Sequence, residues 1–184
     1  MGTLFKRSVL AMLASVAAAA VQAAEVRVEA GEGATERLVE ALITVEPGDT
    51  ILIGPGLYEL TEGLSLDVDD VTVRGAGTGQ TVLSFKGQTG SGEGLLVTSD
   101  RVVLEDFAVE DPKGDGVKSK GSDQITFRNL SVVWTDGPKP ENGAYGVYPV
   151  SSKNVLIDGV FVSGASDAGI YVGQSEDIIV RNSR

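Results

Sequence analysis

The side chains of this sequence that could do chemistry are lysines, carboxylates and aromatic rings. Lys118 and Lys120 lie just after a run of turn residues, and a lysine acts as a general base when its pKa is lowered. We therefore take these two lysines as the candidate catalytic residues. Asp111 and Asp115 precede them, and Asp167 lies further along the chain. Because Ca²⁺ prefers oxygen ligands, these three aspartates are the candidate calcium ligands.

The composition excludes several other kinds of chemistry. The 184 residues include no histidine and no cysteine, so thiolate zinc sites, iron–sulfur clusters, disulfides and cysteine nucleophiles are ruled out. The commonest general base is missing as well. The 26 acidic residues exceed the 15 basic ones, giving a net charge of −11, which is unlike a nucleic-acid-binding protein. The length fits one domain.

Residues 1–23 have the three parts of a secretory signal sequence. A basic pair, Lys6–Arg7, precedes the apolar stretch Ser8–Ala20, and small residues then favour cleavage after Ala23. The alternative is an uncleaved membrane anchor, but the apolar stretch is shorter than the roughly 18–20 residues that span a bilayer. We therefore predict export to the periplasm or the extracellular space. The mature domain, residues 24–184, would have no membrane span.

The rest of the chain repeats one short pattern, an apolar-x-apolar triplet followed by a turn residue. The triplets begin at residues 51, 71, 102, 125, 155 and 178. A strand opened by glycine precedes each of the last five triplets, at Gly63, Gly94, Gly116, Gly146 and Gly169. A third strand follows three of the triplets, at residues 107–109, 130–132 and 160–162. Three short strands per coil of about 23 residues predict a parallel β-helix of about six coils.

Stacked coils place equivalent residues in columns. Because side chains alternate along a strand, the third triplet positions should form an inward column: Ile53, Val73, Leu104, Phe127, Ile157 and Val180. The residue after the triplet alternates in charge from the second coil onward, which predicts an outward ladder of ion pairs: Arg74, Glu105, Arg128, Asp158 and Arg181. Apolar middle positions at Val103, Leu156 and Ile179 predict an outer stripe covered by further chain or by a partner.

The two ends of the repeat differ. The segment Ala34–Ile43 has apolar residues at helical spacing, which predicts a short helix that caps the N-terminal end of the β-helix. The sequence stops at Arg184, directly after a triplet, and an uncovered coil edge is a pairing hazard. We therefore expect further C-terminal coils in a longer chain, or a partner that covers this open end.

The lead-in Glu46–Tyr58, the glycine-opened coils and the helix resemble the right-handed parallel β-helix, or pectate-lyase-like, superfamily. Four stretches are also similar to exported bacterial parallel β-helix repeat proteins without an established activity: Asp115–Lys120, Trp134–Pro138, Asn142–Pro149 and Gly164–Gln174. The resemblance covers Ala34–Arg184 and implies an all-β, single-stranded, right-handed β-helix. It implies function only weakly, because functional sites are grafted on folds.

Alignment of the coils places two insertions in the same turn, before a glycine-opened strand. They are residues 86–93 and 134–143, and the coil between them has a short turn at residues 111–115. This arrangement predicts a groove beside the glycine-opened strands, where the resemblance implies a polysaccharide cleft. Aromatic rings in this region would form a platform for sugar rings, and the candidate substrate-binding residues are Trp134, Tyr145, Tyr148 and Tyr171.

Three activities are consistent with these residues. Elimination or epimerisation of uronic acids would use Lys118 or Lys120 as base, with calcium on the aspartates. Glycoside hydrolysis would use Asp111 and Asp115, although the signatures of β-helix pectin hydrolases are absent. Binding of polysaccharide without catalysis is the third. The alternative to all three is a structural scaffold of the cell envelope, in which lysines face solvent, aspartates form turns and aromatic rings pack loop against coil.

Overall fold

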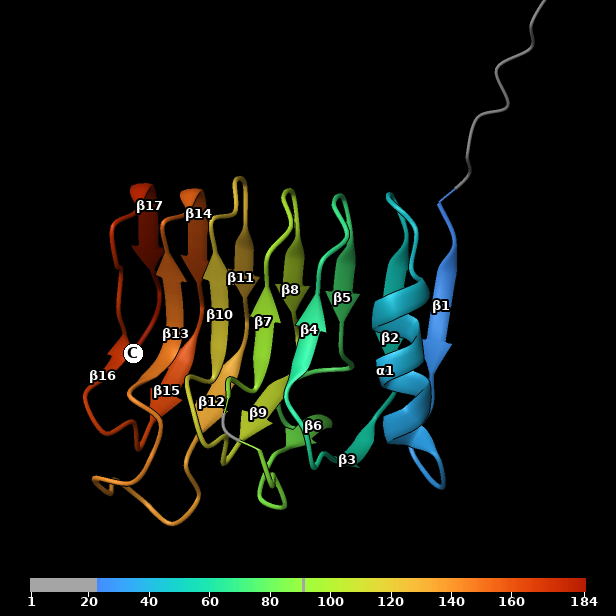
Figure 1. Cartoon of the computed structure of the whole chain (residues 1–184), viewed down its shortest axis with the longest axis horizontal. Helices are drawn as coiled ribbons and strands as arrows, with labels where there is room; N and C mark the ends of the chain where they lie inside the picture. Colours follow the sequence, from blue (N-terminus) through green and yellow to red (C-terminus); the bar gives the residue numbers. More distant parts are fainter. Residues whose placement is uncertain (1–22, 91) are drawn as a thin grey trace, which may run out of the picture.

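The computed structural model describes residues 23–90 and 92–184, and every strand pairing within them is parallel. Strands distant in sequence lie side by side in successive coils, and one short helix covers the N-terminal end (Figure 1). This is the all-β parallel β-helix that the repeat predicted. Residues 1–22 of the predicted signal sequence lie outside the described residues, so export and cleavage after Ala23 stay predictions. They are tested by the N-terminal residue of the mature protein, expected to be Ala24.

Three sheets form the walls. The triplet sheet contains β1 (Glu25–Val28), β2 (Thr50–Ile53), β5 (Thr72–Arg74), β8 (Val103–Glu105), β11 (Thr126–Arg128), β14 (Lys153–Asp158) and β17 (Glu176–Arg181). The glycine-strand sheet contains β4 (Leu64–Leu66), β7 (Leu95–Val97), β10 (Val117–Lys120), β13 (Tyr145–Val150) and β16 (Ala168–Ile170). The third sheet contains β3 (Gly56–Glu59), β6 (Thr81–Ser84), β9 (Ala108–Glu110), β12 (Ser131–Val133) and β15 (Phe161–Ser163).

The inward column is correct except at its two ends. Val73, Leu104, Phe127 and Ile157 are buried and in register, but Ile51 rather than Ile53 pairs with Val73. Ile51 and Val73 are 22 residues apart, which fits one coil, whereas Ile53 and Val73 are only 20 residues apart. Ile53 is buried beside β1 instead. Val180 is 47% exposed because β17 is an edge strand of its sheet.

The predicted charge ladder on the triplet sheet is confirmed at three of its four steps, the exception being Arg128 and Asp158, which form no ion pair. Arg74 donates to Glu105 at 2.6 Å, and Arg128 donates to the other oxygen of Glu105 at 3.0 Å. Further along, Arg181 donates to Asp158 at 2.8 Å, and this hydrogen bond lowers the pKa of the Asp158 carboxyl. Opposite charges on neighbouring parallel strands therefore help to fix the register.

The cap helix α1 (Ala34–Thr44) begins where the sequence predicted and ends one residue later. Leu38 and Leu42 are buried against the first coils, but Val39 and Ile43 point outward and are 38% and 71% exposed. Adjacent helical positions are about 100° apart, so one apolar pair faces the core while the other faces solvent. No helix within residues 23–90 and 92–184 is long and apolar enough to cross a membrane.

Candidate functional site

Two projecting loops enter the glycine-strand sheet from the third sheet, as the alignment of coils predicted. One connects β6 to β7 and the other connects β12 to β13 (Figure 1). The second loop is held from beneath by Trp134, whose indole nitrogen donates to the carbonyl oxygen of Pro112 at 2.8 Å. Trp134 is only 4% exposed, so its proposed role in a sugar platform is wrong. The ring packs loop against coil because burial with a satisfied N–H is more stable than exposure.

Lys118 on β10 is the centre of a charged cluster on the outward side of the glycine-strand sheet. Its ammonium donates to Glu93 Oε1 at 2.8 Å and to Asp115 Oδ2 at 3.1 Å. Glu93 comes from the first loop, and Asp115 comes from the short turn of the next coil. The same ammonium lies 5.0 Å from the centre of the Tyr148 ring, within cation–π range.

The hydrogen bonds of this cluster keep Lys118 protonated, which argues against the predicted role of Lys118 as a general base. Partial burial by itself lowers the pKa of the Lys118 ammonium, but the hydrogen bonds to Glu93 and Asp115 outweigh it and raise this pKa. Lys118 is therefore a firmly protonated cation, whereas a general base must lose its proton near neutral pH. Lys120 lies exposed at the C-terminal end of β10, two residues along the same outward side.

The three candidate calcium ligands do not converge. Both carboxylate oxygens of Asp111 accept hydrogen bonds from Thr135, at 2.7 Å from its backbone nitrogen and 2.7 Å from its hydroxyl. Asp115 is held by Lys118, and Asp167 faces Tyr145. Within residues 23–90 and 92–184, no three carboxylates lie together in a way that could hold a metal ion. The predicted calcium site is therefore not formed, because each aspartate stabilises a loop or an ion pair.

Three tyrosines on two neighbouring coils do form the predicted aromatic cluster. The rings of Tyr145 and Tyr171 stack with centres 4.5 Å apart and 13° between their planes. Tyr148 is tilted against both, at 4.7 Å from Tyr145 and 5.4 Å from Tyr171. Tyr171 is 43% exposed and the other two are half-buried. Burial and the charge of Asp167 raise the pKa of Tyr145, which keeps its hydroxyl protonated as a donor.

Glu93 and Tyr145 occupy equivalent positions in their coils, and this equivalence was not recognised from the sequence. Each directly precedes the glycine that opens its strand, as Asp115 does. The residues before the five opening glycines are Glu62, Glu93, Asp115, Tyr145 and Ala168. This column borders the outward side of the glycine-strand sheet, so the repeat could have revealed Glu93 as a partner of Lys118.

A small cavity lies between the two loops, and the three tyrosines do not line it. It has a volume of about 200 Å³ and carries both signs of charge. Its lining includes Lys86, Lys113, Asp136, Lys139 and Glu141. Lys139 pairs with Asp136 at 3.0 Å, and this hydrogen bond together with the charges of Lys139 and Lys86 lowers the pKa of Asp136. Asp111 also lines the cavity, so three lysines face three carboxylates and the charges nearly cancel.

Residues 67–184 of the chain match the family described as the right handed beta helix region. The chain is a member of this right-handed β-helix family. Among solved structures, an alginate lyase from Paenibacillus sp. str. FPU-7 is similar, with a TM-score of 0.62 and 17% sequence identity. The match covers 87% of this chain and 65% of the lyase, so this β-helix spans less than two thirds of that length.

Two pectin methylesterase structures, both in complex with hexasaccharides, match this β-helix at 11% identity with TM-scores of 0.46 and 0.47. Each match covers 79% of this chain and 54% of the esterase. No curated protein matches the sequence. The likeness to the lyase shows a shared fold, whereas the function of this β-helix depends on its own side chains.

Proposed function

We propose that this β-helix protein binds polysaccharide on the outward side of the glycine-strand sheet, without using Lys118 as a catalytic base. The observation that carries the proposal is the cluster of Tyr145, Tyr148 and Tyr171, whose rings lie 4.5–5.4 Å apart on adjacent coils. A tyrosine ring offers flat apolar area that can pack against the C–H face of a sugar ring, and its hydroxyl can form hydrogen bonds with the sugar hydroxyls. The alginate lyase of the same fold acts on a polysaccharide, which supports a carbohydrate partner at the level of fold.

The charged cluster beside the tyrosines completes this surface. Glu93 and Asp115 hold Lys118 in one orientation, and a fixed set of donors and acceptors selects hydroxyl positions with little loss of side-chain entropy. Lys118 is paired with two carboxylates, so the three groups together do not present a positive charge that would attract a uronate. We therefore propose that neutral stretches of polysaccharide bind more tightly than acidic ones, and that the uronate lyase activity does not operate through Lys118.

Replacing Tyr171 with alanine is expected to weaken polysaccharide binding about tenfold, which corresponds to about 1.4 kcal/mol. The measurement is affinity electrophoresis in gels that contain hydroxyethyl cellulose, polygalacturonate or alginate. Ile179→Ala is the matched control, because Ile179 is 58% exposed on a different sheet and is expected to leave binding unchanged. The proposal is overturned if the wild-type protein binds none of the three, or if Tyr171→Ala binds as well as Ile179→Ala.

The Lys118 cluster should give stability a pH dependence at both extremes. Its raised pKa means that the contribution of Lys118 is complete below its ordinary value of 10.5 and is lost as the pH rises through the higher folded value. The hydrogen bond and charge of Lys118, aided by Lys120, overcome burial and lower the pKa of Glu93. The contribution of Glu93 is therefore complete above its ordinary value of 4.5 and is lost as the pH falls through the lower folded value.

The test is urea unfolding across this pH range. Lys118→Met should remove most of the alkaline loss and reduce the acid loss, whereas the exposed Lys120→Met should leave the alkaline loss in place. If both variants follow the wild-type pH profile, the Lys118 cluster does not stabilise the protein in solution.

A further inference from the structure

Large apolar side chains are exposed only at the two ends of the described solenoid. Five of them lie in the last strands and turns, where no further coil is stacked: Phe161, Tyr171, Val172, Ile179 and Val180. The other three, Val39, Ile43 and Leu57, lie around α1, at the end that a helix already caps. The apolar surface at α1 is therefore not explained by a missing neighbour for an edge coil.

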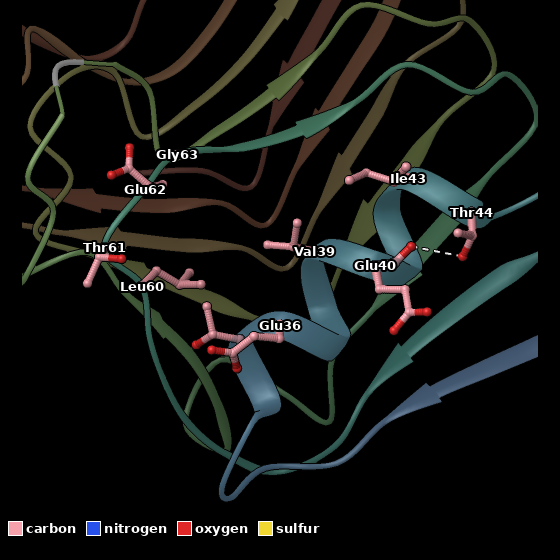
Figure 2. A pocket seen from close by; sticks show the side chains of 10 residues that line it. Glu36, Val39, Glu40, Ile43, Thr44, Leu60, Thr61, Glu62 and Gly63 are labelled. Carbon is pink, nitrogen blue, oxygen red and sulfur yellow. Dashed lines mark hydrogen bonds between the residues drawn. The ribbon is translucent and has the colours of Figure 1, made fainter.

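The exposed side of α1 forms one wall of a groove. A cavity of about 530 Å³ separates α1 from the segment that leads into β4, and Val39 projects from the helix toward Leu60 and Gly63 (Figure 2). A second cavity of about 220 Å³ extends to Ser65 on β4. Val39, Ile43 and Gly63 line both cavities, so the two form one continuous groove, which we call the α1 groove.

The α1 groove is apolar at its walls and acidic at its margin. Val39 and Ile43 supply the exposed apolar surface, and the buried Leu60 lies behind it. Glu36 and Glu40 lie on the helix side, and Glu62 lies on the opposite side (Figure 2). Among the residues that the structure describes, no lysine or arginine lines either cavity. The groove therefore combines apolar area with uncompensated negative charge.

We propose that the α1 groove docks a segment of a partner protein that carries apolar side chains flanked by lysine or arginine. Its combined cavities have the size of pockets that bind ligands, and burial of apolar side chains there would remove Val39 and Ile43 from water. Lysine or arginine at the ends of the segment would meet Glu36, Glu40 and Glu62, and such complementarity decides which partner binds. The groove lies at the opposite end of the solenoid from the tyrosines, so this docking is separate from polysaccharide binding (Figure 1).

The test uses three fluorescein-labelled peptides with the full-length mature protein. Each peptide has the core Leu-Ala-Val-Leu, flanked on both sides by two lysines, two glutamates or two serines. Fluorescence anisotropy should show that the lysine peptide binds at least tenfold more tightly than the serine peptide, and that the glutamate peptide binds most weakly. The affinity of the lysine peptide should fall as salt is added, because the charges at the groove are exposed.

Variants then locate the binding site. Ile43→Ser and Glu36→Gln with Glu40→Gln should each weaken binding of the lysine peptide about tenfold, and neither change removes a buried side chain. Ile179→Ser exchanges an apolar residue that is also largely exposed (58%, against 71% for Ile43) at the other end, and should have no effect. The proposal is overturned if the three peptides bind alike or if Ile43→Ser binds as the wild type. It is also overturned if the protein self-associates through Ile43, since a second copy would then occupy the groove.

Discussion

Replacing Phe127 with alanine is expected to lower the free energy of unfolding by about 3–5 kcal/mol. Phe127 is fully buried, and its strand pairs on one side with Leu104 and on the other with Ile157. Alanine would leave a cavity in the middle of the solenoid, where stacked coils cannot close the gap without breaking the backbone hydrogen bonds between them. The midpoint of urea unfolding measures the loss.

Val180→Ala is the control for this variant. Val180 occupies the same column, but it is 47% exposed at the edge strand β17 and packs against little. Its replacement should cost less than about 1 kcal/mol, because little apolar area is buried there. Equal losses for Phe127→Ala and Val180→Ala would contradict the difference in burial between the central coils and β17.

Replacing Gly116 with alanine is expected to cost about 1–3 kcal/mol, or more if the coils cannot separate. A methyl group at this position would meet a methyl carbon of Val132 and the carbonyl oxygen of Gly146, the latter at 2.5 Å. The backbone cannot move away easily, because the Gly116 nitrogen donates to Tyr145 and its oxygen accepts from Leu95. Glycine is therefore required at Gly116 because there is no room for a side chain. It is not required by the backbone conformation, since φ at Gly116 is not in the left-handed region.

Gly79→Ala is the matched control for the strand-opening glycine. Gly79 lies in an exposed turn, where a methyl group would meet no atom within 4 Å and the backbone has no positive φ. Alanine there should leave stability unchanged or raise it by up to about 1 kcal/mol, because it reduces the freedom of the unfolded chain. Thermal unfolding of both variants makes the comparison, and a Gly116→Ala protein as stable as Gly79→Ala would refute the steric explanation.

The repeat in the sequence predicted most of the fold because each coil repeats the same local rules. Alternation placed the buried column, the spacing of glycines placed the glycine-strand sheet, and alternating charges placed the ladder around Glu105. The first coil was misaligned at Ile53 because local pattern alone cannot distinguish two inward positions on one strand. The strands β1, β3 and β6 were missed: β1 precedes the first triplet that the repeat search recognised, and a third strand was predicted only after three later triplets.

The candidate site could be predicted from the local sequence pattern only in part. The sequence by itself determined that Tyr145, Tyr148 and Tyr171 lie beside the glycine-opened strands, because the coil repeat fixes the position of each strand. Only the tertiary structure decided that Glu93 and Asp115 hold Lys118 as a cation. Loop side chains have no fixed period, and the free energy of an ion pair depends on distances across coils that sequence spacing does not specify.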